Sequence, residues 1–160
     1  MQITNLLTLI GLGGVAIGLL LNVWAVHRGN VQKRAEFLMH LYDKMLSDDI
    51  MDIFFKLEYG KIKKIKENSA DEKNLNKLLS LFDNIGHLKE TTKNFTDDDL
   101  EYFAMEIIST FKNRVVKEYL ESIEKDYTKQ YKNFKHLDLI KPFGDFKKLA
   151  CDLIRKYEGL

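Results

Sequence analysis

The chain begins with a long apolar segment, and further along its apolar residues recur at helical spacing. Residues 3–26 contain no charged residue. A helix of that length, rising 1.5 Å per residue, crosses a hydrocarbon core about 30 Å thick. All Lys, Arg, Asp and Glu residues follow this segment. The pattern predicts a transmembrane anchor over residues 1–28, which carries a helical domain over residues 29–160.

Apolar positions three and four residues apart predict the first two helices of that domain. One is expected over residues 31–46. Gly29-Asn30 is a plausible break or kink before it; alternatively, because no proline intervenes, this helix simply continues the membrane helix. The next follows Ser47-Asp48-Asp49, which combines a cap residue with acids in the first turn, and it is expected to end near Gly60.

Three more helices complete the predicted domain. One opens with the capping-box spacing of Ser69 and Glu72 and runs to about Glu90. A long one is expected over residues 96–130 with a kink near Asn113, and Asp145 is expected to cap the last. No stretch shows strict alternation with turn punctuation. The predicted fold class is all-α, with one N-terminal transmembrane helix and a cytosolic bundle of about five helices.

The charges beside the apolar segment predict its orientation. Met1-Gln2 carries no Lys or Arg, whereas Arg28, Lys33 and Arg34 follow the segment. The positive-inside rule then places the N-terminus outside and the C-terminal domain in the cytoplasm, at the cytoplasmic (inner) membrane. A cleaved signal peptide is the rival interpretation. It is disfavoured because the positive n-region is missing and the apolar core exceeds the usual 7–15 residues.

The single cysteine, Cys151, permits no internal disulfide and agrees with a reducing compartment. It lies beside Leu149, Ala150 and Leu153, so we expect it to behave as a small buried hydrophobe. A cysteine nucleophile would need an activating base, and the sequence identifies none.

One face of the apolar helix is rich in small residues. Gly11, Gly14, Gly18 and Asn22 follow steps of three and four. Such small-xxx-small faces let helices pack closely in lipid, and the asparagine can hydrogen-bond across the contact. We expect a homo-oligomer through this face. Glycines are also common in membrane spans, and lining a pore in a higher oligomer is a sharper alternative.

The charge balance limits the partners of the domain. The chain has 25 basic and 24 acidic residues, which argues against general nucleic-acid binding. One short segment departs from this balance of charge. In it, two isoleucines are flanked by Lys61, Lys63, Lys64 and Lys66. These lysines are either a solvated helix or loop, or they contact anionic headgroups or a phosphate-bearing ligand.

The best candidate for catalysis or metal binding is the helical trio Asp83, His87 and Glu90. The spacing i, i+4, i+7 could offer ligands on one face, but that face is expected to point to water. Bundle metal sites pair Glu-x-x-His motifs from separate helices, and no second match is present. Walker, GxSxG and HExxH motifs are absent from the sequence. We therefore expect no metal, no cofactor and no enzymatic activity; a metal-using enzyme at this trio is the disfavoured alternative.

Three segments carry a resemblance to a family of small, uncharacterised bacterial proteins. They are residues 34–42 leading into residues 50–54, residues 78–88, and residues 99–103 with Asn113 and residues 118–120. The chain resembles this family in having one N-terminal membrane helix and a helical cytosolic domain, and the family supplies no activity to transfer. The architecture is also similar to membrane effectors of bacterial antiviral defence, in which a cytosolic domain senses a nucleotide messenger or a partner.

Two functions remain open at this point. The first is an oligomeric, non-enzymatic sensor or effector in the membrane, whose cytosolic domain responds to a small-molecule or protein trigger. The alternative is a passive anchor or adaptor that recruits a cytosolic protein to the lipid membrane.

Overall fold

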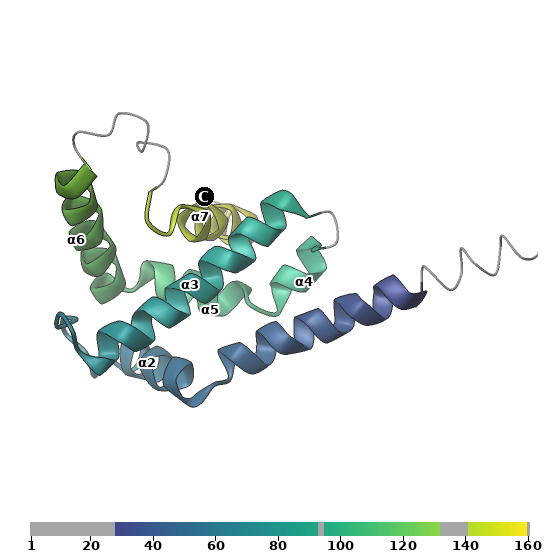
Figure 1. The fold of residues 1–160 in the computed structure, drawn as a ribbon, viewed down its shortest axis with the longest axis horizontal. Coiled ribbons are helices and arrows are strands. Elements are labelled where there is room, and N and C mark those ends of the chain that lie inside the picture. Colours follow the sequence, from purple (N-terminus) through teal and green to yellow (C-terminus); the bar gives the residue numbers. More distant parts are fainter. Residues whose placement is uncertain (1–27, 93–94, 132–140, 160) are drawn as a thin grey trace, which may run out of the picture. The chain divides into compact units, whose positions relative to one another are not determined.

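The protein is all-helical in the parts that its computed structural model describes, which are residues 28–92, 95–131 and 141–159. A helix covers residues 28–45, and six labelled helices follow it (Figure 1). These are α2 (Asp48–Glu58), α3 (Ala70–Thr91), α4 (Asp97–Glu101), α5 (Ala104–Lys112), α6 (Arg114–Tyr131) and α7 (Gly144–Glu158). No strand occurs within those ranges. The contacts divide the chain into two units, residues 1–40 and 41–160, and α2 to α7 belong to the second.

Of these alternatives the break at Gly29-Asn30 is wrong, because both residues lie within the helix over residues 28–45. One glycine costs a helix interior only about 1 kcal/mol relative to alanine, which is too little to interrupt a periodic segment without proline. The last turns of this helix belong to the second unit, where Leu41 and Met45 are buried.

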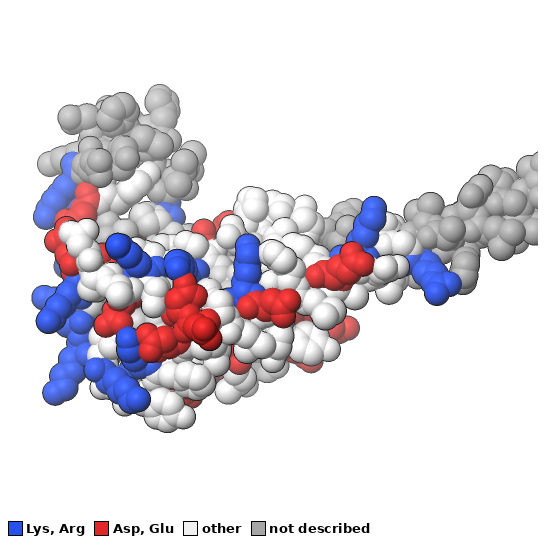
Figure 2. All heavy atoms as spheres, turned by 60° about the horizontal axis from the view of Figure 1, so that its bottom comes forward, with Lys and Arg blue, Asp and Glu red and all other residues white. Residues whose placement is uncertain are grey.

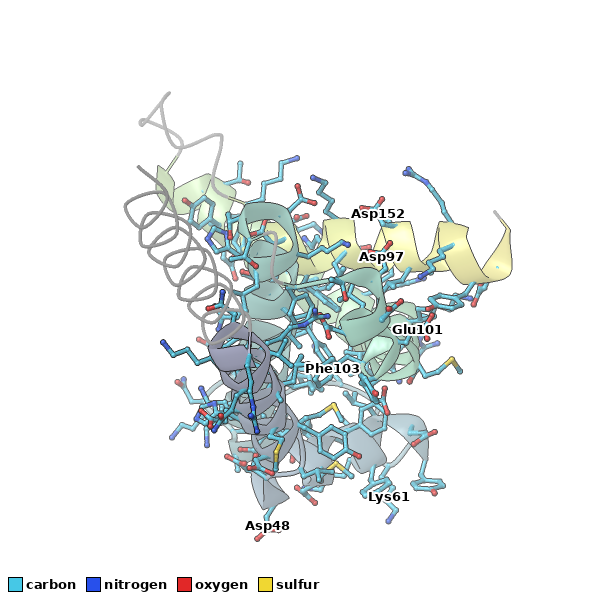
Figure 3. All side chains as sticks on the ribbon, turned by 90° about the vertical axis from the view of Figure 1, so that its right-hand side faces the viewer. Asp48, Lys61, Asp97, Glu101, Phe103 and Asp152 are labelled. Atoms are coloured by element: carbon cyan, nitrogen blue, oxygen red, sulfur yellow. The ribbon has the colours of Figure 1, made fainter. Side chains whose placement is uncertain are left out.

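The core of the second unit is organised around α3, which packs against both α2 and α7. Phe82 of α3 stacks on Phe146 of α7 with ring centroids 5.8 Å apart, and both are fully buried. Phe111 of α5 meets Phe146 edge-on at 5.8 Å. Phe103 lies in the middle of the unit, just before α5 (Figure 3). Full burial of such a ring contributes about 2–3 kcal/mol, so this aromatic contact joins three helices into one core.

The single long helix expected over residues 96–130 is wrong, since the chain there forms α4, α5 and α6. Thr96 and Asp99 form the capping box that starts α4, which confirms the expected helix start. The kink expected near Asn113 is a complete break, with an extended ψ of 128°. The side-chain amide Nδ2 of Asn113 donates to the Leu57 carbonyl at 3.1 Å, and its Oδ1 accepts from the Val115 N–H at 2.9 Å. Asn113 therefore caps α6 and ties it to the end of α2.

Within the described residues, no helix combines the length and apolar character needed to cross a membrane. The segment that the sequence predicts to do so, residues 3–26, lies outside them.

Candidate functional site

The four predicted lysines lie in the connection between α2 and α3, here named the lysine loop (residues 61–66). The sequence left open whether these lysines lie on a helix or in a loop. The connection is not helical, so they lie in a loop. Gly60 and Asn68 both have positive φ, 63° and 60°, and they turn the chain at either side of the loop. Ser69 then caps α3 by accepting the Glu72 N–H at 3.1 Å, as its spacing predicted.

The second half of the predicted capping box is displaced by one residue. Glu72 does not reach back to Ser69; its Oε2 accepts the backbone N–H of Asn68 at 2.6 Å. This bond holds the left-handed turn at Asn68 directly beneath the start of α3. The C-terminal end of the lysine loop is therefore fixed by the helix that follows it.

The positive charge of the lysine loop is not neutralised by any ion pair within the described part of the chain. The nearby carboxylate of Asp71 is engaged by Lys56, whose Nζ lies 2.9 Å from it and 2.6 Å from Asp52. These contacts, Asp52 first, raise the pKa of Lys56 above its ordinary value. In Figure 2, basic side chains gather at the end of the unit that carries the α2–α3 connection.

The lysine loop borders a surface hollow of about 450 Å³. The lysines share its lining with Ile62, Ser69 and Asp71. Apolar groups accompany the charge: Ile62 and Ile65 are half-buried, and Tyr59 is 68% exposed. The Tyr59 ring stacks on Phe55 with centroids 6.0 Å apart. Lys61 lies at the outer edge of the unit, beyond α2 (Figure 3). The site thus combines cations that have no ion pair within the described residues with accessible apolar side chains.

The elements on both sides of the lysine loop are held by a part-buried network. The Tyr119 hydroxyl of α6 lies 3.1 Å from Glu72 Oε1 and 3.0 Å from Asn76 Oδ1 on α3, and these two acceptors share its one proton. Burial, and then the Glu72 carboxylate, raise the pKa of Tyr119 to about 12. With the Asn113–Leu57 bond, this network fixes the end of α2 and the start of α3 against α6. The loop therefore lies between two helix ends that are both hydrogen-bonded to α6.

A second polar hollow, of about 470 Å³, lies between the start of α2 and one face of α3. No motif in the sequence pointed to this hollow, although the α3 residues in its lining recur at helical spacing. Its central cation, Lys77, forms an ion pair with Asp49. This pair and the Ser47 hydroxyl lower the pKa of Asp49 to about 2. The lining residues are Lys44, Ser47, Asp49, Ile50, Lys73, Asn76, Lys77, Ser80, Leu81 and Asn84.

His87 and Glu90 are exposed, as expected, and Asp83 is half-buried, but all three side chains also contact α7. Asp83 accepts the Phe146 N–H at 2.9 Å, His87 Nδ1 lies 3.1 Å from Asp145 Oδ2, and Glu90 pairs with Lys148 at 2.7 Å. The trio therefore joins two helices. Within the described ranges, no three His, Cys, Asp or Glu side chains are arranged to hold a metal ion.

Two expectations for α7 also need correction. Its cap is not Asp145, which lies inside the first turn of a helix that follows Phe143. Cys151 is exposed, because it lies on the outer side of α7 while Leu149, Ala150 and Leu153 are buried. On α6, Arg114 Nε lies 3.2 Å from Glu118 Oε1, an ion pair of residues four apart.

The predicted oligomerisation residues Gly11, Gly14, Gly18 and Asn22 lie outside the described residues. Comparisons with protein families, with curated proteins and with solved structures gave no match.

Proposed function

We propose that this chain is a single-pass protein of the cytoplasmic membrane, with its N-terminus outside and its helical unit in the cytosol. The observation that carries the proposal is the charge-free segment 3–26, followed at once by His27 and Arg28. A segment of this length and composition is favourable in a bilayer, and the basic residues after it set the orientation. The described helices form a domain that such an anchor would hold at the inner leaflet.

We further propose that the anchors associate through Gly11, Gly14, Gly18 and Asn22. The stripe lets two helix backbones approach closely, and Asn22 gains a hydrogen-bond partner instead of facing hydrocarbon. Association in the membrane would give the protein two states, with the helices apart or packed together. A trigger that binds the helical unit better in one state would shift that equilibrium.

The activity proposed is that of a non-enzymatic sensor and effector. Lysines outside the lysine loop, Lys44 and Lys73 among them, are exposed on the helical unit and support recognition of a phosphate-bearing trigger, since ammonium groups bind phosphate oxygens by charge-assisted hydrogen bonds. A nucleotide messenger of bacterial antiviral defence has this chemistry. Its binding would release the action of the membrane helices on the bilayer.

Inducible expression in bacteria with a membrane-potential dye tests this proposal. Three proteins are compared: the full chain, residues 1–46, and residues 1–46 with Gly14→Leu and Gly18→Leu. We expect residues 1–46 to depolarise the cells, the full chain to remain silent, and the double substitution to abolish depolarisation. Depolarisation that persists with both leucines would contradict the proposed helix contact. Silence of residues 1–46 despite membrane insertion would contradict the effector.

A second candidate, a membrane adaptor, is favoured by exposed apolar side chains on the helical unit. Tyr59 and Tyr102 are each 68% exposed and Met105 is 72% exposed. Aromatic residues and methionine are enriched where proteins bind one another. An adaptor would keep its activity when an unrelated transmembrane helix replaces residues 3–26. An effector that needs the glycine face would lose it.

A further inference from the structure

We propose that the lysine loop docks the helical unit on the anionic phospholipid surface of the membrane in which the chain is anchored. This inference rests on the proposed membrane anchor and names what the lysine loop contacts. It adds a second, electrostatic attachment to the hydrophobic one.

The charge of the lysine loop fits a bilayer surface. Four lysines lie within six residues, and none of them has an ion pair in the described part of the chain. Elsewhere on the unit several lysines are paired, as Lys56, Lys77 and Lys147 are with Asp71, Asp49 and Glu124, and those without an ion pair among the described residues, such as Lys117 and Lys125, are not clustered in a run. The cytoplasmic leaflet carries a negative surface potential that attracts clusters of four to eight such residues. Among the described residues, the lysine loop therefore holds the densest run of lysines without an ion pair.

The apolar side chains beside the lysines favour a lipid surface over a small phosphate ligand. Ile62 and Ile65 alternate with the cations, and Tyr59 exposes an aromatic ring next to them. Aliphatic and aromatic groups gain by entering the headgroup region, where tyrosine is enriched. A soluble phosphate would use the lysines but leave these groups in water. The other hollow offers less charge to an anion, because Asp49 neutralises Lys77.

The conformation of the loop also suits docking. The lysine loop is short, and its ends are fixed by α2 and by the Ser69 and Glu72 bonds at the start of α3. Its ends are thus already ordered before it meets a surface. Little backbone entropy is lost on contact, and the lysine stems can carry their ammonium groups to the headgroups.

Trypsin provides a direct test, because each lysine of the loop is a cleavage site. The full chain is reconstituted in vesicles of phosphatidylcholine alone, or of phosphatidylcholine with phosphatidylglycerol. Cleavage in the lysine loop is measured relative to cleavage at Arg155, which is exposed on α7 of the same unit. We expect the relative rate to fall about tenfold on the anionic vesicles and to recover at high salt, which screens the attraction.

Substituting two lysines at a time distinguishes an effect of the lysine loop from an effect of the net charge of the protein. Lys61→Gln with Lys66→Gln keeps Lys63 and Lys64 as cleavage sites and should remove most of the protection. Lys117→Gln with Lys125→Gln removes the same charge from exposed positions on α6 and should leave protection unchanged. Equal protection in both double variants would overturn the proposal.

Two further results are decisive. Protection on neutral vesicles by inorganic pyrophosphate, without protection by phosphatidylglycerol, would overturn the proposal in favour of a soluble phosphate ligand. Alkaline extraction of the same vesicles reports the anchor separately. Protein that resists extraction yet shows no protection refutes docking alone, whereas protein that is extracted refutes the proposed anchor.

Discussion

Asp83 of α3 caps the N-terminus of α7, because its carboxylate accepts the backbone N–H of Phe146 at 2.9 Å. No side chain within α7 itself makes a cap hydrogen bond at this end, which follows Phe143 in a left-handed conformation. A carboxylate at a helix N-terminus satisfies an unpaired donor and opposes the positive end of the helix dipole. The start of α7 is thus supplied by a residue 63 positions earlier in the chain.

Replacing Asp83 by alanine should destabilise the protein by about 1–2 kcal/mol, since a buried N–H loses its acceptor and a helix loses its cap. Urea unfolding of the full chain in a neutral detergent, followed by circular dichroism, measures the change. Asp126→Ala is the control, because Asp126 is exposed and lies 3.7 Å from Lys129 on α6. That change should stay within about 0.5 kcal/mol. Equal effects of the two substitutions would contradict the cap.

Gly86 should not tolerate alanine, because α7 lies directly against it. An added Cβ would be 2.6 Å from the Asp145 carbonyl oxygen and 2.8 Å from its carbon, both of them backbone atoms. We expect Gly86→Ala to destabilise by about 2 kcal/mol, despite the better helix propensity of alanine. Gly29→Ala is the matched helical control, with nothing within 4 Å of its Cβ, and it should be neutral or stabilising. A neutral Gly86→Ala would show that the helices are farther apart.

The contact of Asp49 with Lys77 should make the free energy of unfolding depend on pH in the acidic range. Hydrogen bonds from Lys77 and then Ser47 lower the pKa of Asp49 from 3.8 to about 2. A depressed carboxyl pKa stabilises the fold above the unfolded pKa, and the contribution is lost as the pH falls toward 2. Unfolding of wild type and Asp49→Asn should therefore differ most above about pH 5 and converge near about pH 2. A difference that widened in acid would contradict this assignment.

Tyr119 should be the tyrosine that ionises last. Burial and the Glu72 carboxylate raise its pKa to about 12, so the folded state retains this proton. Its contribution to stability is present below about pH 10 and is lost as the pH rises through about 12. In an absorbance titration of the seven tyrosines, Tyr119→Phe should remove the component of highest pKa. Retention of that component would place it on another tyrosine.

Periodicity was sufficient to predict α2, α3 and α7, whose buried residues follow the expected steps. It failed over residues 96–130 because the apolar period continues across both breaks. Ile107 and Val116 are fully buried on opposite sides of Asn113. The break at Asn113 combines a local feature, the bond of its side chain to the Val115 N–H, with a contact to Leu57 that comes from a distant segment and leaves no local signal.

The candidate site was predicted in part. The run of lysines identified the lysine loop, but local sequence does not show that Lys56 engages the neighbouring Asp71. The Asp83, His87 and Glu90 spacing was also recognised, while its contact with α7 was missed. Gly86 lies on the same face of α3, and a glycine inside a helix often marks the close approach of another backbone. That residue was the signal available for the helix contact.

The natural cysteine provides the most direct test of the membrane topology on which this account depends. Cys151 is exposed on α7, so a membrane-impermeant maleimide can reach it wherever the helical unit is open to the reagent. The full chain is expressed in bacteria and labelled in intact and in permeabilised cells. A Gln2→Cys variant in a Cys151→Ser background reports the other side of the proposed anchor. We expect Cys151 of the natural chain to be labelled only after permeabilisation, and the Gln2→Cys variant to be labelled in intact cells. Labelling of Cys151 in intact cells, or protection of both positions, would contradict a single-pass protein with a cytosolic helical unit.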